Sequence, residues 1–251
     1  MGVELFRFSN SRGLWLSAAL HGPLGEWRQS WVILSHGMLS TKDSRKHTEL
    51  SERLAGLGFP VLRFDFSGQG ASEGEPWEIT YGNGVDDLLC ASRELFRRGA
   101  ERFLLIGSSM GSGVSILASK MLKEKVVGLA LMASVTNCNL IYESLSEADR
   151  NIWEERGTFY FEERPVGFSH VEDARDHDLT AALSAFTGPA LFIHGREDEL
   201  IPAQNLEAFS RLSGGKTDLI VVDGADHRFS QEAHRLRLIE EVALWAARNI
   251  P

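Results

Sequence analysis

Cysteine is scarce in this chain, and the two that occur argue against several kinds of site. Cys90 and Cys138 lie far apart in the 251-residue sequence and belong to no Cys-x-x-Cys or metal-ligand pattern. We therefore expect two reduced thiols in a cytoplasmic protein and no metal site.

Long apolar runs and long basic runs are also missing. No stretch approaches 18 uncharged apolar residues, so we expect no transmembrane helix. The first residues contain no basic region followed by an apolar one, which predicts no signal peptide. Phe6 stands where the myristoylation motif needs Ser or Thr. The net charge of −9 and the isoelectric point near 5.4 disfavour nucleic acid and anionic membrane surfaces as partners.

The composition is typical of one α/β domain, with 43% hydrophobic and 24% charged residues. Strand-like and helix-like stretches alternate, which predicts a parallel sheet with helices on both faces and a single domain over residues 1–251. A loop is expected at 22–25. The expected strands are 3–8, 14–20, 31–35, 59–64, 103–106, 126–132, 190–193 and 218–222, and the expected helices are 44–57, 85–96, 114–121, 202–212 and 230–248.

One segment breaks this alternation. About 55 residues separate the strand that ends near Ala133 from the one that begins at Ala190, more than a normal crossover needs. Short helices are expected at 137–145 and 148–156. We interpret residues 134–184 as a cap over a pocket, and the alternative is a surface insertion whose aromatic rings pack on the body. The candidate substrate contacts in it are Tyr142, Trp153, Phe159 and Tyr160.

The motif Gly107-Ser108-Ser109-Met110-Gly111 stands between an expected strand and an expected helix. In that context a Gly-x-Ser-x-Gly motif indicates a nucleophilic serine. The chain must turn sharply there, and the two glycines leave room for the turn. Ser109 Oγ is then held at the strand end beside the first N–H groups of the helix, whereas Ser108 is expected to point into the turn.

A serine hydroxyl needs a base to take its proton, and a histidine steered by a carboxylate supplies one. In this architecture the acid and then the histidine should follow Ser109 in the chain. Asp198 and His227 fit, because each lies on a loop after an expected strand, at the same rim of the sheet as Ser109. Acids that stay open as alternatives to Asp198 are Glu197, Glu199 and Asp223.

The other histidines are interpreted as structural or surface residues, because they lie at strand ends, inside helices or away from the rim loops: His21, His36, His47, His170, His177, His194 and His234. Acyl transfer also needs two donors for the oxyanion. Met110 N–H directly follows the nucleophile, and Met38 N–H lies on the loop after the third expected strand. A single glycine follows His36, so this loop is not of the His-Gly-Gly-Gly type.

Together these motifs resemble the serine esterases of the α/β-hydrolase superfamily. The resemblance covers nearly the whole chain except the cap. It is carried by His-Gly-Met at 36–38, Asp-Phe-Ser-Gly-Gln-Gly-Ala-Ser-Glu-Gly at 65–74, the serine motif at 107–111, the acid loop at 194–202 and Asp-His at 226–227. The most similar groups are small bacterial cinnamoyl (feruloyl) esterases, acyl thioesterases and monoglyceride lipases.

The resemblance implies an α/β-hydrolase fold with a mostly parallel, eight-stranded sheet, an antiparallel second strand and a cap insertion after the sixth strand. It implies no metal and no organic cofactor. In such proteins the 65–74 loop is mainly a structural turn, so Asp65 is not assigned to catalysis.

We therefore expect a serine hydrolase that cleaves carboxylic esters of small or medium acyl or aryl groups through an acyl-enzyme. A thioesterase or acyltransferase would use the same residues, and a non-catalytic interaction protein is the alternative from another class. The net charge of −9, with acids in the cap (Glu154, Glu155, Glu162 and Glu163), favours neutral small esters over strongly anionic substrates. The acyl-chain length and the oligomeric state stay open.

Overall fold

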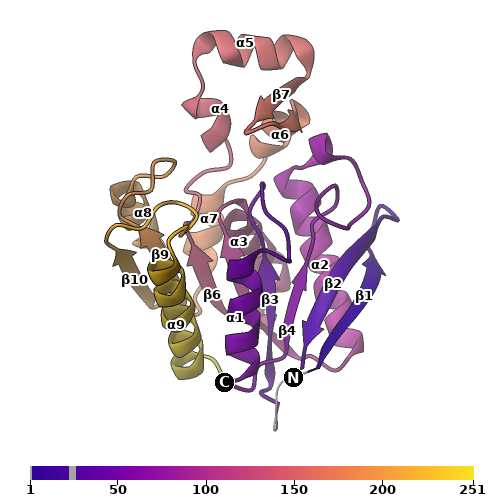
Figure 1. Ribbon diagram of the computed structural model, residues 1–251, viewed down its shortest axis with the longest axis vertical. Coiled ribbons are helices and arrows are strands. Elements are labelled where there is room, and N and C mark those ends of the chain that lie inside the picture. The colour runs from indigo at the N-terminus through magenta and orange to yellow at the C-terminus, as the bar shows by residue number, and fades with distance from the viewer. Residues whose placement is uncertain (1, 23–26) are drawn as a thin grey trace.

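Eight strands form one sheet in the part of the chain that the computed structural model describes, residues 2–22 and 27–251 (Figure 1). Most of the expected loop at 22–25 lies outside these residues. The strands of the sheet are β1 (Val3–Ser9), β2 (Trp15–His21), β3 (Ser30–Ser35), β4 (Val61–Phe64), β5 (Arg102–Ser108), β6 (Val126–Met132), β9 (Ala190–Gly195) and β10 (Thr217–Val222).

Of the eight strands in this described sheet, β2 alone runs in the opposite direction to the others. The order across the sheet is β1-β2-β4-β3-β5-β6-β9-β10, with β2 antiparallel to β1 and β4 and the other pairs parallel. The predicted mostly parallel sheet with an antiparallel second strand is confirmed. Because β3, β5, β6, β9 and β10 run in parallel, their carboxyl ends meet at one edge, and the loops that follow them share that edge.

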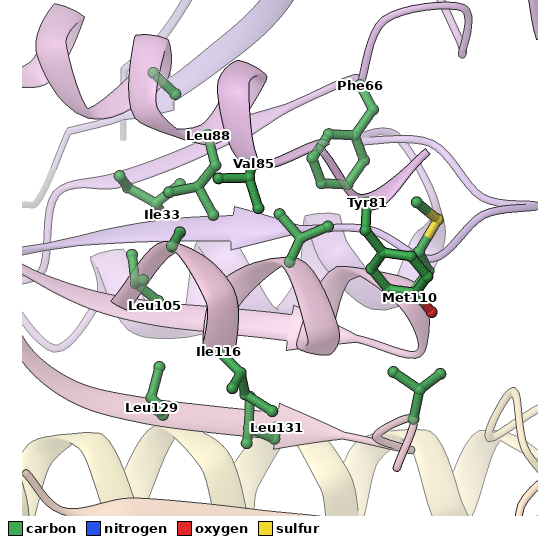
Figure 2. Close-up of a cluster of buried hydrophobic side chains, with 14 of the residues drawn as sticks. Ile33, Phe66, Tyr81, Val85, Leu88, Leu105, Met110, Ile116, Leu129 and Leu131 are labelled. Atoms are coloured by element: carbon green, nitrogen blue, oxygen red, sulfur yellow. The ribbon is translucent and has the colours of Figure 1, made fainter. Parts of the chain in front are cut away.

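Helices cover both faces of the sheet. On one face lie α2 (Tyr81–Arg97) and α3 (Met110–Leu122), and on the other α1 (Arg45–Ala55) and α9 (Glu232–Asn249). Alternate strand residues serve the two faces: Leu105 packs with the first helix pair and Leu104 with the second. Figure 2 shows Ile33, Leu105, Leu129 and Leu131 of the strands beside Val85, Leu88 and Ile116 of α2 and α3.

Helix α2 begins four residues before the expected start at 85. Thr80 caps it by accepting a hydrogen bond from Asn83 N–H. The glycines in its first turn are weak helix formers and hide this start from the sequence pattern. Gly84 serves packing instead, because a Cβ there would lie 2.8 Å from Val114 of α3.

The segment between β6 and β9, residues 133–189 and called the insertion segment below, lies largely beyond the carboxyl ends of the strands (Figure 1). Its elements are α4 (Leu140–Ser144), α5 (Glu147–Arg156), β7 (Thr158–Phe161), β8 (Arg164–Gly167), α6 (Ser169–Ala174) and α7 (Leu179–Ala185). The two expected short helices match α4 and α5. The remaining described elements are α8 (Ala203–Ser210) and two 3₁₀ turns, Pro76–Glu78 and Lys123–Lys125.

The hairpin of β7 and β8 is not predicted from the sequence. Glu162 and Glu163 form its two-residue turn with φ angles of 47° and 67°. Turns with two positive φ angles usually carry Asn and Gly, so a Glu-Glu pair gives no hairpin signal. No helix in the described ranges is long and apolar enough to cross a bilayer.

Candidate active site

Ser109 occupies a strained turn between β5 and α3. Its φ and ψ angles are 52° and −122°, a region that costs a residue with a side chain about 1–3 kcal/mol. A Cβ on Gly107 would collide with the backbone of Gly111, and one on Gly111 would collide with the carbonyl oxygens of Ser35 and His36. Backbone therefore meets backbone on both sides of the turn, and the strained conformation of Ser109 is held by its surroundings.

The structure brings Ser109, His227 and Asp198 together. Ser109 Oγ lies 3.0 Å from His227 Nε2, and His227 Nδ1 lies 2.7 Å from Asp198 Oδ2. The three side chains come from the loops after β5, β10 and β9, which share one edge of the sheet. Because the carboxylate only accepts, the imidazole carries its proton on Nδ1, and Nε2 accepts from the serine hydroxyl.

Asp198 is buried and held as a carboxylate. Its Oδ1 accepts hydrogen bonds from the N–H groups of Leu200 and Ile201 at 2.9 and 2.8 Å. Burial acts to raise the pKa of Asp198, but the hydrogen bonds from His227 and Ile201 N–H outweigh it, and the pKa lies below its ordinary value. A negative charge therefore faces the imidazole at neutral pH.

The rival acids lie in different surroundings. Asp223 forms an ion pair with Arg196 at the surface, and Glu197 and Glu199 are exposed. Among the histidines, His194 Nε2 lies 2.7 Å from the carbonyl oxygen of Ile201, and burial lowers its pKa. Only Asp198, of the four candidate acids, is hydrogen-bonded to His227 in the described chain.

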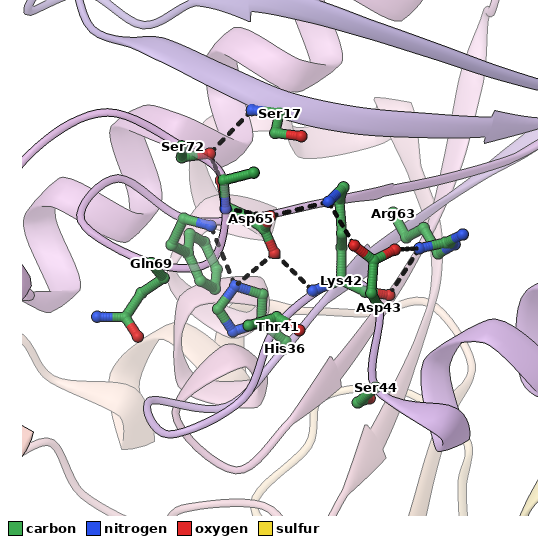
Figure 3. A network of polar contacts seen from close by, with 12 residues as sticks. Ser17, His36, Thr41, Lys42, Asp43, Ser44, Arg63, Asp65, Gln69 and Ser72 are labelled. Atoms are coloured by element: carbon green, nitrogen blue, oxygen red, sulfur yellow. Dashed lines mark hydrogen bonds and ion pairs between the residues drawn. The ribbon is translucent and has the colours of Figure 1, made fainter. Parts of the chain in front are cut away.

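A buried polar network fixes the loop after β3 (Figure 3). His36 Nε2 accepts a hydrogen bond from Phe66 N–H at 3.1 Å, which leaves the ring proton on Nδ1, 2.7 Å from the carbonyl oxygen of Gly37. Burial lowers the pKa of His36 and keeps the ring neutral. Asp65 accepts from the backbone N–H of Lys42 at 2.7 Å and from its ammonium at 3.0 Å.

The His36 contact orients the next peptide unit. The peptide between Gly37 and Met38 is trans, so its C=O and N–H point in opposite directions. With the oxygen held by His36, Met38 N–H points away from that ring, on a loop where a Gly37 Cβ would lie 3.2 Å from Ser109 Cβ. Met38 N–H donates to no protein group among the described residues.

Met110 supplies a second N–H at the same place. It is the first residue of α3, and the first N–H groups of a helix have no intrahelical acceptor. Met38, Met110, Ser109 and His227 all line one cavity of about 410 Å³. The residues that carry these two backbone N–H groups, the serine hydroxyl and the imidazole thus line the same space.

The four aromatic residues expected to contact substrate do not line this cavity. Trp153 is fully buried, donates from Nε1 to the carbonyl oxygen of Val166 at 3.0 Å, and packs against Tyr142 and Phe159 with ring centroids 6.2 and 5.5 Å apart. Tyr160 is 67% exposed. Trp153 belongs to the buried cluster on the α2–α3 face of the sheet, and Tyr142 and Phe159 pack against that cluster, so these three rings fasten the segment to the body. The insertion segment lines the cavity with other residues: Val135, Cys138, Leu140, Ile141, Ser144, Phe161 and Glu162.

Two further residues line the cavity in a way that is not predicted from the sequence. Ser108, expected to point into the turn, lines the cavity, and its Oγ accepts a hydrogen bond from Lys46 Nζ at 3.0 Å. Lys46 was not singled out because a lysine in an amphipathic helix gives no signal of a site. In the described part of the chain, no group of His, Cys, Asp or Glu side chains is placed to hold a metal ion.

The sheet, the strained serine and the loops around it define an α/β hydrolase. A family model for serine aminopeptidases (S33) matches residues 28–154, about half of the chain. The chain belongs to this family, and with it to the α/β-hydrolase superfamily.

Similar proteins agree with this placement. Palmitoyl-protein thioesterase ABHD10, mitochondrial, from Mus musculus is 28% identical over 211 residues, which cover 80% of this chain and 70% of that protein. Lysophosphatidylserine lipase ABHD12 from Danio rerio is 24% identical over 243 residues, covering 85% and 62%. The structure of Est1E from Butyrivibrio proteoclasticus with bound ferulic acid matches the fold with a TM-score of 0.88, at 20% identity and 98% and 99% coverage.

The His36 contact predicts that His36→Phe lowers kcat by about a hundredfold with little change in KM, because Met38 N–H loses its fixed direction. The unfolding free energy should also fall by about 1–3 kcal/mol, since Phe66 N–H loses its acceptor. His170→Phe is the control, because its ring bonds to the carbonyl oxygen of Ile79, in another loop. Equal kcat values for the two folded variants would contradict the orienting role.

The packing of the insertion segment predicts different effects when two of its aromatic residues are replaced by alanine. Trp153→Ala should lower the unfolding free energy by about 3–5 kcal/mol, because the ring is fully buried. Phe161→Ala should lower the melting temperature much less than Trp153→Ala, because its ring is only partly buried, but should alter kcat/KM unevenly across esters of graded acyl length, by about 1–3 kcal/mol for those that touch the ring. Parallel losses on every ester in Phe161→Ala would show that this ring does not contact substrate.

Proposed function

We propose that this protein is a serine hydrolase that cleaves carboxylic esters through an acyl-enzyme. The observation that carries the proposal is the hydrogen-bonded chain from Ser109 through His227 to Asp198 at the edge of a cavity. Both distances lie within the reach that proton transfer to a general base needs. The Asp–His–Ser arrangement supports ester or thioester chemistry, and the family independently supports a hydrolase.

In the first half of the reaction Ser109 Oγ attacks the ester carbonyl and His227 Nε2 takes its proton. The Asp198 carboxylate stabilises the imidazolium that forms and holds its orientation. The oxyanion of the tetrahedral intermediate accepts hydrogen bonds from the N–H groups of Met38 and Met110. Loss of one such donor typically lowers kcat by about 10²–10³-fold.

In the second half the intermediate collapses and the leaving alkoxide takes the proton from His227. The acyl group remains on Ser109 Oγ. His227 then removes a proton from water, the resulting hydroxide attacks the acyl carbonyl, and the acid leaves as the proton returns to Ser109. The three side chains and two backbone N–H groups supply every group that this sequence needs, so we propose no metal or organic cofactor.

A thioester is the second candidate substrate. The observation that favours it is the 28% identity to a protein named as a palmitoyl-protein thioesterase. Apolar residues of the cavity, including Leu140, Ile141 and Phe161, support an acyl chain as the group bound beside Ser109. The same residues act on either bond, so a substrate panel has to separate the two.

We propose that residues 134–184 act as a cap within a single domain. An ion pair between Glu162 at the β7–β8 turn and Arg228 supports this, because Arg228 directly follows His227. We also propose a small-molecule substrate and a cytoplasmic location, and cell fractionation tests the location.

The nucleophile assignment predicts that a fluorophosphonate probe labels the protein at Ser109 and that Ser109→Ala abolishes labelling. Only a hydroxyl with a neighbouring base reacts with such a probe at a useful rate. Ser108→Ala is the matched control and should still be labelled. The measurement is the mass of the labelled peptide, and undiminished labelling of Ser109→Ala would refute the assignment.

The acid assignment predicts that Asp198→Asn lowers kcat by about 10⁴-fold, the effect known for a triad aspartate. Glu197→Gln and Asp223→Asn should stay within a few-fold of the parent, because exposed acids contribute little. Steady-state rates on one ester compare all three variants. An equally large loss of kcat in Asp223→Asn would contradict the assignment of Asp198 as the acid.

A further inference from the structure

Lys46 reaches the cavity at a distinctive place. It lies in the first turn of α1, and its Nζ donates to the Oγ of Ser108, the residue before the proposed nucleophile. The side chain is partly buried, and the ammonium lies 6.0 Å from the centroid of the Phe229 ring. Burial lowers its pKa to about 8, so the group carries its charge at neutral pH while partly removed from water.

The other cations of the cavity are already neutralised. Arg45 and Arg235 form ion pairs with Glu49 and Glu232, and Arg228 forms one with Glu162. Lys46 alone among the cavity cations has no carboxylate at ion-pair distance within the described residues. A partly desolvated cation beside a hydroxyl can bind an anion more strongly than a fully hydrated one, because it has less water to lose.

We infer that Lys46, with Ser108 Oγ, forms a subsite for an anionic group of the substrate. The substrate class is then an ester or thioester that carries a carboxylate or phosphate a few bonds from the scissile carbonyl. This inference rests on the proposed function and deepens it. It also reverses the expectation from the net charge of −9, because the charge of the whole chain does not describe the charge beside Ser109.

The first test compares substrates that differ in one charge. One pair compares an aryl monoester of glutarate with the aryl ester of pentanoate, and here the anionic group lies on the acyl side of the scissile bond. The other pair compares an acylglycerol phosphate with the monoacylglycerol of the same acyl chain, and here the anionic group lies on the alcohol side. The inference predicts that kcat/KM for the anionic member exceeds that for its neutral partner by about tenfold or more in at least one pair.

Variants assign the preference to Lys46. Lys46→Met should lower the anionic-to-neutral ratio about tenfold or more, and Lys46→Arg should restore much of it. Lys120→Met is the control for loss of one positive charge, because Lys120 is exposed near the end of α3 and does not line the cavity. If Lys46 had only a structural role, Lys46→Met would lower both kcat/KM values in proportion and leave their ratio unchanged.

The ratio should also fall as the pH rises through about 8, because Lys46 then loses its proton. The Ser109–His227–Asp198 chemistry is common to both substrates, so its own pH dependence cancels in the ratio. The charged groups that act on Lys46 are Arg228 and Asp226, and hydrogen bonds outweigh burial to lower the pKa of Asp226. Burial lowers the pKa of His47 well below its ordinary value, so that ring stays neutral. Lys46→Met should therefore give a flat profile.

The outcomes separate this inference from the proposed function. Fluorophosphonate labelling at Ser109 with turnover of neutral esters, but a ratio at or below one in both pairs, would overturn the anionic subsite alone. A preference that survives Lys46→Met would also overturn it. Absence of labelling at Ser109 would instead refute the proposed function.

Discussion

The close approach of backbone at Ser109 is the constraint on which the rest of the site depends. Gly111 lies against the carbonyl oxygens of Ser35 and His36, so β3, β5 and the start of α3 meet without side chains between them. That contact holds Ser109 at a positive φ and places the loop after β3 against it. A side chain at Gly107 or Gly111 would force these backbone segments apart and disturb the position of Ser109.

The charged groups around this turn fall into two sets, one buried and one at the cavity. In the buried set, His36 and Asp65 belong to a network in which each polar atom that orients the loop after β3 has a hydrogen-bond partner. At the cavity, most cations are paired and Lys46 is bonded to a serine hydroxyl instead. The first arrangement fixes the loop after β3, and the second is the basis for the proposed anionic subsite. The acidic composition of the chain conceals this difference.

Much of the sheet and the grouping of Ser109, Asp198 and His227 could be predicted from sequence. Buried parallel strands read as short apolar runs, and the loops after them must share an edge, so order along the chain is enough to bring the three residues together. The insertion segment could not be resolved in this way. Its Glu-Glu turn carries no hairpin signal, and its aromatic residues serve either a core or a pocket depending on packing that periodicity does not encode. The cavity role of Lys46 depends on the tertiary contact with Ser108, since its position on the helix is that of an ordinary surface lysine.

The central claim, that Ser109 forms an acyl-enzyme with His227 as its base, is tested most directly by rapid mixing with p-nitrophenyl acetate followed by peptide mass mapping of the quenched protein. The account predicts a burst of nitrophenol close to one equivalent per protein, with the acetyl group on the peptide that contains Ser109, wherever deacylation is the slower step. Acetyl found on another residue, or turnover that continues at the parent rate in Ser109→Ala, would contradict it.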